Sequence, residues 1–189
     1  EIRSLMLDGL KHALTVKAFW LFLTIFFIAM GVFNGVTTWV EDIIRPRGFS
    51  PIDAGTVGAL MLVGGVIGAV TIPLFLLAGF LLAIPSLIGV TYATSPWLLF
   101  FSSFCLEFCL VGVSPIGIQY AAEITQPTPE GTSNGLIQLF GQASVVFVYI
   151  MEATKAPDGA FTPALLLATG LLVISVLLAT QLQDPHYAN

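Results

Sequence analysis

The chain has 189 residues, of which 57% are hydrophobic and only 9% are charged, with a net charge of -5 at pH 7. Soluble domains carry about 25% charged residues, so this chain has too few charges to cover a water-facing surface. A mean hydropathy of +0.96 agrees with that reading. The six basic residues form no cluster, which excludes a nucleic-acid-binding patch. The composition predicts an integral membrane protein whose main partner is the lipid bilayer.

Six apolar segments predict an all-α, polytopic fold. Residues 1–17 mix Leu, Met and Ile with Arg, Asp, Lys and His, which predicts an amphipathic lead-in helix on the membrane surface. A membrane-spanning helix needs about 20 mostly apolar residues. Six segments between residues 18 and 182 meet or approach that length: 18–40, 51–74, 75–92, 96–122, 135–153 and 163–182. Residues 183–189 remain as a C-terminal tail, and an even number of spans places both termini on one side.

The junction between the second and third segments lacks a polar turn. Residues 71–92 read TIPLFLLAGFLLAIPSLIGVTY, and nothing polar lies between Thr71 and Ser86. Because a turn at the membrane surface exposes backbone groups, it should carry polar residues. We therefore expect that a short charged loop is missing from the sequence near Leu74 and Phe75. The alternative is a very tight hydrophobic hairpin.

The two halves of the bundle resemble each other in sequence. Two pairs of segments align: MGVFNGVTTWVED (30–42) with VGVSPIGIQYAAE (111–123), and DAGTVGALMLVG (53–64) with EGTSNGLIQLFG (130–141). Asp53 thereby pairs with Glu130. Since equivalent segments are three spans apart, the second copy is inverted across the membrane, as in many secondary transporters. We expect two inverted three-helix repeats, 18–92 and 96–182; chance similarity among apolar helices is the alternative.

The fifth segment carries a polar stripe. At 100° per residue, five polar side chains fall within about 40° of one line along the helix: Asn134, Gln138, Gln142, Tyr149 and Glu152. Lipid does not tolerate such a stripe, so it faces the bundle interior or a watery cavity. Hydrogen bonding between helices alone would also account for it. Asn34 and Gln119 form smaller polar faces, whereas the third and sixth segments have no polar stripe and are expected to seal against lipid.

Glu107 ends the longest uncharged run of the chain, residues 54–106. It lies ten residues after Trp97, hence about 15 Å along the helix and near mid-membrane. An ionised carboxylate there costs at least about 3 kcal/mol, so the group is expected to be protonated or beside a cavity or a partner. It is a carboxyl that couples transport to a proton or binds a cation, a neutral acid hydrogen-bonded to another helix, or an engineered substitution in a fragment. Glu152 is a second candidate for coupling.

No motif predicts an enzyme, a cofactor or a metal site. Cys105 and Cys109 share a helix face from which Glu107 points away, so these three residues do not form a metal site. His12 and His186 both lie near the termini, and the chain has no nucleophile elbow, phosphate loop or zinc-type His pair.

Residues 113–142, VSPIGIQYAAEITQPTPEGTSNGLIQLFGQ, resemble helices 10 and 11 of major facilitator superfamily transporters. The segment AAEITQPTPEGTSNG is most similar to the feline leukaemia virus subgroup C receptor-related transporters, whose tenth helix ends in Glu-x-x-x-Pro-x-x-Glu-Gly. The residues that match this motif are Glu123, Pro127, Glu130 and Gly131. The chain departs from the family at Gln119, where an acid is common, and at Gln126, where an aromatic residue is common.

The resemblance implies that the chain is the C-terminal six-helix half of a transporter in the cell membrane, plasma or inner, with both termini in the cytoplasm. It also implies a cytoplasmic charged loop between the second and third helices, and a pathway lined by the first, second, fourth and fifth spans. A half of this kind needs a second six-helix unit, which is either an N-terminal half missing from this sequence or the mate in a homodimer.

The function expected on these grounds is secondary active or facilitative transport of a small solute by alternating access. The residues expected to contact the solute are Asn34, Gln119, Gln138, Gln142 and Tyr149. The alternative is a non-transporting membrane receptor or assembly module in which the polar stripes serve only helix packing.

Overall fold

The computed structural model describes residues 2–71, 76–112 and 114–182, and every regular element in these ranges is a helix. Five helical stretches are long and apolar enough to cross a membrane: Lys17–Arg47, Pro51–Ala69, Pro96–Ile124, Glu130–Thr154 and Thr162–Ala179. Ala78–Tyr92 is a shorter apolar helix. An all-helical chain with five or six such helices is compatible with the expected polytopic membrane protein. The expected loop near Leu74 and Phe75 lies outside the described residues, as does the tail 183–189.

The helices follow the predicted segments closely, and the fifth segment is divided into two helices. In chain order they are α1 (Ile2–Thr15), α2 (Lys17–Ile44), the 3₁₀ turn η1 (Arg45–Arg47), α3 (Pro51–Thr71), α4 (Leu76–Tyr92), α5 (Pro96–Gly112), α6 (Ser114–Ile124), α7 (Glu130–Ala143), α8 (Val146–Thr154) and α9 (Thr162–Ala179). The first, second, third and sixth predicted segments correspond to α2, α3, α4 and α9. The fourth corresponds to α5 and α6, on either side of residue 113.

The fifth segment differs from its prediction as one continuous helix over 135–153. The structure begins α7 earlier, at Glu130, and separates it from α8 at Ser144 and Val145. Here two backbone hydrogen bonds reach three residues back and not four. Val145 N–H donates to Gln142 O, and Phe147 N–H donates to Ser144 O. Bonds of this 3₁₀ type wind the chain more tightly than an α-helix does.

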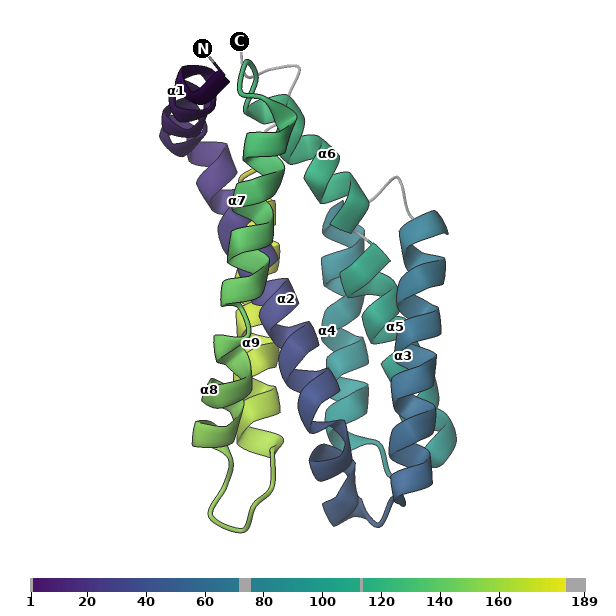
Figure 1. Cartoon of the computed structure of the whole chain (residues 1–189). Helices are drawn as coiled ribbons and strands as arrows, with labels where there is room; N and C mark the ends of the chain where they lie inside the picture. Colours follow the sequence, from purple (N-terminus) through teal and green to yellow (C-terminus); the bar gives the residue numbers. More distant parts are fainter. Residues whose placement is uncertain (1, 72–75, 113, 183–189) are drawn as a thin grey trace.

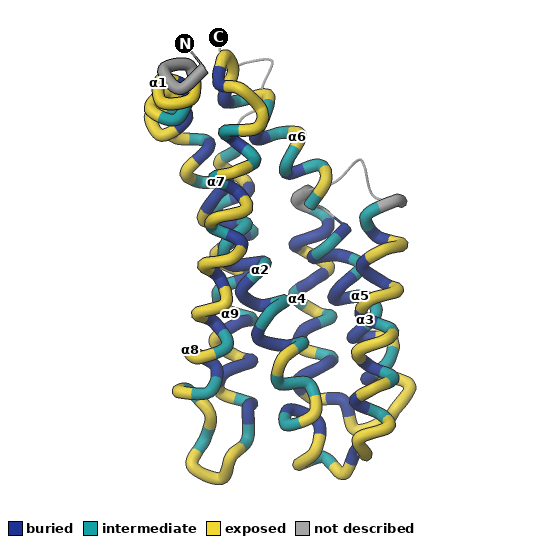
Figure 2. The backbone as a smooth tube through the Cα atoms, viewed as in Figure 1, coloured by how far each residue is buried: buried dark blue, intermediate teal, exposed yellow. Residues whose placement is uncertain are grey.

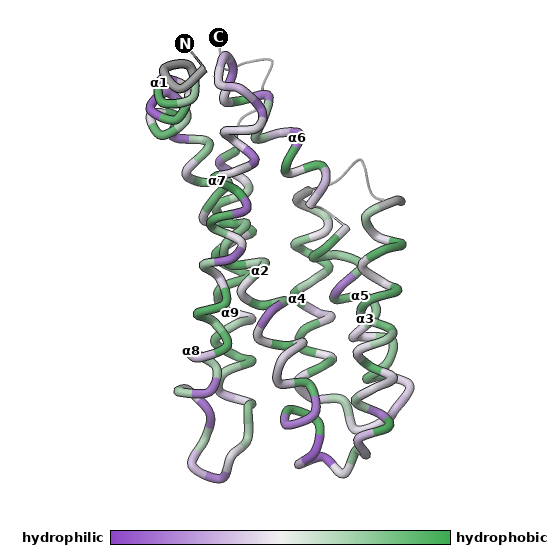
Figure 3. Tube along the Cα trace, in the orientation of Figure 1, coloured by the Kyte–Doolittle hydropathy of each residue, from purple (hydrophilic) through white to green (hydrophobic). Residues whose placement is uncertain are grey.

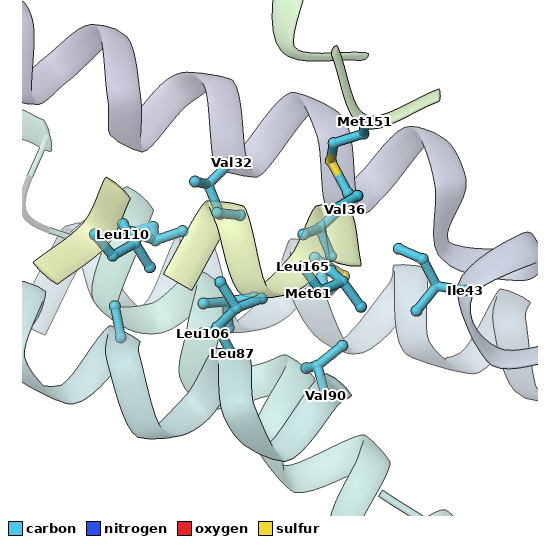
Figure 4. Packing of buried hydrophobic residues seen from close by; sticks show 14 of the residues in the cluster. Val32, Val36, Ile43, Met61, Leu87, Val90, Leu106, Leu110, Met151 and Leu165 are labelled. Atoms are coloured by element: carbon cyan, nitrogen blue, oxygen red, sulfur yellow. The ribbon is translucent and has the colours of Figure 1, made fainter. Parts of the chain in front are cut away.

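Helix α2 runs diagonally through the bundle, with α7, α8 and α9 on one side and α3, α4 and α5 on the other (Figure 1). Its buried side chains meet those of both groups in one hydrophobic core, part of which is drawn in Figure 4. In that view Val32 and Val36 of α2 lie near Leu106 of α5 and Leu165 of α9. The core thus places α2 at the centre of the membrane-spanning region.

A second, smaller core lies at the end of the bundle that carries α1. Ala13 of α1 and Phe19 of α2 are buried there with Ala121 of α6 and Ile137 of α7, and Leu182 packs against the same cluster. The beginning and the end of the described chain therefore lie at one end of the bundle.

Glycines allow two pairs of helices to approach closely. A Cβ atom at Gly64 of α3 would lie 2.5 Å from the carbonyl oxygen of Phe104, and one at Gly112 of α5 would lie 2.9 Å from the carbonyl carbon of Gly68. Small residues at helix contacts are typical of membrane proteins, where van der Waals packing replaces the hydrophobic effect between helices. Gly31 of α2 similarly faces the ring of Phe147 in α8.

Arg47 ties the α2–α3 connection to the end of α4. Its Nη1 atom lies 2.6 Å from the carbonyl oxygen of Val90, 3.1 Å from that of Thr91 and 3.0 Å from that of Ala93. The guanidinium also lies 5.7 Å from the ring centroid of Phe49. The last carbonyl groups of a helix have no partner within it, so Arg47 supplies the donors that these groups need.

We predict that Arg47→Ala lowers the free energy of unfolding by about 1–3 kcal/mol, because it leaves several helix-end carbonyls without a charged donor. Arg45→Ala is the matched control. Arg45 is exposed, and its ion pairs within the described ranges are with Glu41 and Asp42 in the last turn of α2, so its loss has little effect. Thermal unfolding of the detergent-solubilised protein measures both variants, and equal shifts in the melting temperature would show that the Arg47 contacts do not stabilise the fold.

Candidate functional site

The exposed faces of the helices differ in polarity, as Figures 2 and 3 show. Every exposed residue within α9 is apolar or glycine: Pro163, Leu166, Leu167, Gly170, Val173, Ile174 and Leu177. Over its described side chains, α4 exposes only Leu81, Leu82, Pro85, Ile88 and Tyr92. Faces of this composition suit contact with lipid tails.

The exposed face of α7 and α8 carries polar groups among apolar ones. Gln138, Gln142 and Tyr149 are all exposed, and Tyr149 is 72% exposed. They recur at the three- or four-residue spacing of one helix face, and the exposed apolar side chains beside them are Leu139, Val145, Val146 and Ile150. Of the predicted stripe, Asn134 is turned further inward, and its Oδ1 atom is buried without a hydrogen-bond partner among the described residues.

Asn34 of α2 contacts the break between α7 and α8. Its Nδ2 atom donates to Ser144 Oγ at 3.0 Å, and Ser144 Oγ donates to the carbonyl oxygen of Gly141 at 2.6 Å. One turn further along α2, Trp39 Nε1 donates to the carbonyl oxygen of Val148 at 3.0 Å. Two polar side chains of α2 thus hold α7 and α8 on either side of the break.

Neither the break at Ser144 nor the hydrogen bond from Asn34 to it was predicted from the sequence. Neither Ser144 nor Val145 is a helix breaker, and no proline or glycine occupies these two positions. The only local signal is Ser144 itself, a small hydroxyl residue that can bond to a carbonyl of the preceding turn and bend a membrane helix. Identifying Asn34 as its partner requires the tertiary structure.

Gln119 and the family motif lie at the α1 end of the bundle. Gln119 Nε2 donates to Glu123 Oε1 at 2.9 Å, and both side chains are exposed on α6. No recorded hydrogen bond within the described ranges joins Gln119 to Gln138 or Gln142. Gln119 and the α7–α8 stripe are therefore separate polar features in this structure.

The loop between α6 and α7, which contains the motif residue Pro127, holds α1 in place. Thr128 Oγ1 donates to the carbonyl oxygen of Gly9 at 3.0 Å, and His12 Nε2 lies 3.1 Å from the carbonyl oxygen of Gln126. The motif acids Glu123 and Glu130 are both exposed, and neither takes part in these two contacts.

Glu107 is fully buried in α5 at 0% exposure, and neither carboxylate oxygen has a hydrogen-bond partner in the described part of the chain. Ser103, one turn earlier and also fully buried, likewise lacks a partner for its hydroxyl. Burying such groups unpaired is costly, and far more so for a charge. The expectation of a neutral acid bonded to another helix therefore finds no bonding partner here.

Glu152 has a different environment at the far end of α8. It is half exposed and forms an ion pair with Lys155, which follows α8. The structure thus separates the two acids proposed for coupling, since one is enclosed in the core and the other is paired at the bundle end. No group of three or more His, Cys, Asp or Glu residues in the described ranges is placed to hold a metal ion.

The fold and its faces are compatible with a multi-pass membrane protein, and comparison with known proteins identifies its relatives. No protein-family model matches the chain. An uncharacterized protein of Caenorhabditis elegans is 32% identical over 79% of the chain and 32% of its own length. An uncharacterized protein of Archaeoglobus fulgidus is 29% identical over 84% of the chain and 76% of its own length.

Among the named relatives are transporters of the kind that the sequence resembles. The choline/ethanolamine transporter flvcr2a of Danio rerio is 28% identical over 92% of the chain, which spans 40% of that protein. Homologues at 26–28% identity also include further choline/ethanolamine transporters and an MFS-type transporter. The chain is therefore a homologue of the major facilitator-type transporters related to the feline leukaemia virus subgroup C receptors, and it spans only part of most relatives it matches.

Cysteine accessibility distinguishes a wet pathway from simple packing. In a background in which Cys105 and Cys109 are replaced by alanine, we predict that a membrane-impermeant thiol reagent labels single cysteines on the exposed face of α7 and α8: positions 135, 138, 142 and 149. Cysteines on the buried face, at positions 133, 137, 141 and 147, stay unlabelled.

The control is the exposed face of α9, with cysteines at positions 166, 170, 173 and 177. These positions are open in the chain but face lipid, so an impermeant reagent does not reach them. Equal protection of both exposed faces would support the non-transporting module, because the α7–α8 stripe would then be dry.

Proposed function

We propose that this chain is one six-helix half of a carrier that moves a small solute across the cell membrane by alternating access, with both termini in the cytoplasm. It acts as a carrier and not as an enzyme. The observation that carries the proposal is the exposure of Gln138, Gln142 and Tyr149 on α7 and α8, whereas the described parts of α4 and α9 expose no amide or charged side chain. Polar side chains that have no partner among the described residues need water or a second unit against them.

The packing of the helices supports the inverted repeat. An exchange of α2 with α5–α6, α3 with α7–α8, and α4 with α9 maps most packed pairs onto other packed pairs. The contact between α3 and α5 corresponds to that between α2 and α8, and the contact between α4 and α5 corresponds to that between α2 and α9. Likewise α2–α3 corresponds to α6–α7, and the contact between α4 and α9 corresponds to itself. The contact between α8 and α9 is not matched by an equal contact between α3 and α4. Inverted repeats of this kind are widespread in transporters.

The second six-helix unit is either an N-terminal half on the same polypeptide or another copy of this chain. The Danio rerio relative, 40% of which the chain spans, has room for two such units. The Archaeoglobus fulgidus relative does not, because the chain already covers 76% of its length. The longer relative therefore supports an N-terminal half on the same polypeptide, and the shorter one supports a second copy of the chain.

The proposed solute site is the face of α7 and α8 around the break. Gln138 and Gln142 offer amide donors and acceptors, and the ring of Tyr149 offers a surface for a cation. Asn34, the other predicted contact near the break, bonds to the buried Ser144 on the side that faces α2, and Gln119 lies towards the cytoplasmic end. Choline and ethanolamine, named for the relatives, are the first solutes to test, since each combines an ammonium group with a hydroxyl.

We predict that Gln142→Ala lowers kcat/KM for uptake about tenfold, which corresponds to the loss of about 1.4 kcal/mol of hydrogen bonding to the solute. Uptake of labelled choline by the full-length protein in proteoliposomes measures it. Gln126→Ala is the matched control, because Gln126 is exposed in the α6–α7 loop, away from the stripe. Unchanged uptake by a well-folded Gln142→Ala protein would remove Gln142 from the site.

Glu107 is the proposed coupling acid. Glu107 is the only Asp, Glu, Lys or Arg in the sequence from Ala54 to Cys109, and the stretch 18–40 of α2 has none. The helices packed around it thus supply no fixed countercharge, and a proton is the partner that such a carboxyl can acquire and release as the site opens. Glu152 is already paired with Lys155 and fits this role less well.

If Glu107 carries a coupled proton, an inward proton gradient accelerates uptake by the unmodified protein and leaves Glu107→Gln unaffected, because an amide does not bind the proton. The measurement is initial uptake with and without an imposed pH difference across the vesicle membrane. Glu130→Gln, which alters an exposed acid at the start of α7, keeps the response. Uptake that ignores the gradient in the unmodified protein would exclude proton coupling through Glu107.

A further inference from the structure

A small polar pocket opens at the end of the bundle opposite α1. It has a volume of about 210 Å³ and lies between the end of α2, the turn η1 and the connection from α8 to α9. The wall residues that matter for its chemistry are Trp39, Asp42, Arg45, Glu152, Lys155 and Phe161. Two carboxylates, two cations and two aromatic rings thus surround one cavity.

The charges in this pocket are balanced by short-range pairs on each side. Arg45 is held by Glu41 and Asp42 through contacts of 2.6 Å and 3.1 Å. Across the cavity, Lys155 pairs with Glu152. The four charged wall residues sum to zero and Glu41 beside them adds one negative charge, so an ammonium ion that takes the place of Lys155 enters a site already supplied with carboxylates.

The surroundings of Lys155 form a recognition site for an ammonium group. Its Nζ atom bonds to Glu152 and lies 5.9 Å from the ring centroid of Phe161. A carboxylate together with an aromatic face is the combination that binds ammonium ions in proteins. The second carboxylate oxygen of Glu152, Oε2, is buried without a partner in the described chain, so the site has further capacity to accept hydrogen bonds.

The aromatic wall of the pocket is held in place independently of Lys155. The indole N–H of Trp39 donates to the carbonyl oxygen of Val148 at 3.0 Å, and its ring centroid lies 5.3 Å from that of Phe161. Because these contacts do not involve the ammonium group, the wall stays formed when Lys155 leaves.

We propose that this pocket is an outer binding site for a small organic ammonium ion, which enters by exchanging with the ammonium group of Lys155. The proposal rests on the proposed function for its ligand class and adds to the α7–α8 face a second site at the opposite membrane surface from α1. Its volume is below the roughly 300–1,000 Å³ of sites for drug-sized ligands, so it suits a ligand of a few heavy atoms.

The replacement of Lys155 by an ammonium ion is favoured because the ion pair that it breaks, between Lys155 and Glu152, is partly exposed. The side chains of Lys155 and Glu152 are 38% and 40% exposed, and pairs of this kind contribute little net stability because water competes for both partners. The lysine stem is long and flexible, so the released ammonium group remains solvated at the rim. Arg45 does not compete for the site, because two acids on α2 already hold it.

The fluorescence of Trp39 reports occupation of the pocket. The chain has three tryptophans, so Trp20→Phe with Trp97→Phe leaves Trp39 as the reporter. The protein in lipid nanodiscs is titrated with tetramethylammonium chloride and choline chloride, with sodium chloride at equal ionic strength as the salt control. We expect a saturable change in Trp39 emission with both ammonium ions and none with sodium.

Two variants test the exchange with Lys155. If Lys155 fills the site in about nine of ten molecules, Lys155→Met tightens binding about tenfold, because the internal competitor is gone. Glu152→Gln weakens binding tenfold or more, since it removes the carboxylate. The matched controls are Lys17→Met at the other end of α2 and Glu130→Gln at the start of α7, both exposed, and neither changes the affinity.

The absence of a saturable response, or an affinity unaffected by both Lys155→Met and Glu152→Gln, overturns the outer site. A response of equal size to sodium chloride also overturns it, because that salt carries no ammonium group. Uptake that persists without any Trp39 response refutes this proposal and leaves the proposed function intact. A Trp39 response without uptake has the opposite meaning, since it retains the ammonium site and refutes transport.

Discussion

The constraint on which this structure depends is the absence of water in the hydrocarbon core, where a polar side chain must find a partner in the protein or face a cavity. Helix α2 meets the constraint by bonding across to α7 and α8, through Asn34 to Ser144 and through Trp39 to Val148. Gln138 and Gln142 lie on the opposite face of α7 and point out of the bundle. The polar groups of α7 and α8 that face α2 are therefore bonded within the bundle, whereas those on the exposed face need water or a second unit as their partner.

The break at Ser144 gives this division a mechanical consequence. It lies between Gln142 at the end of α7 and Tyr149 in α8, so the proposed solute contacts are on two rigid pieces joined by a tightened turn. Interrupted helices at substrate sites are a recurring feature of transporters. Asn34 bonds to the hydroxyl at the break, so α2 contacts α7 and α8 at the point where the two pieces join.

The spans were predictable because hydropathy over twenty residues is a property of the local sequence, and α2, α3, α4 and α9 begin within one residue of their predicted positions. That Gln142 and Tyr149 share one helix face followed from helical spacing in the same way. The break at Ser144 was not predictable, because no proline or glycine marks it. Arg47 was missed for another reason, since its acceptors on α4 are 43 to 46 residues away.

The two ends of α7 and α8 are fixed by different kinds of contact, which bears on how the proposed outer site fills. At the start of α7, the α6–α7 loop is bound to α1 through Thr128 and Gly9. At the end of α8, Trp39 of α2 donates to the carbonyl oxygen of Val148, and its ring lies against that of Phe161. The ion pair of Lys155 with Glu152 is local, because the two residues are three positions apart in the chain. An ammonium ion that replaces Lys155 therefore leaves both attachments in place, so the outer site fills without releasing α7 or α8.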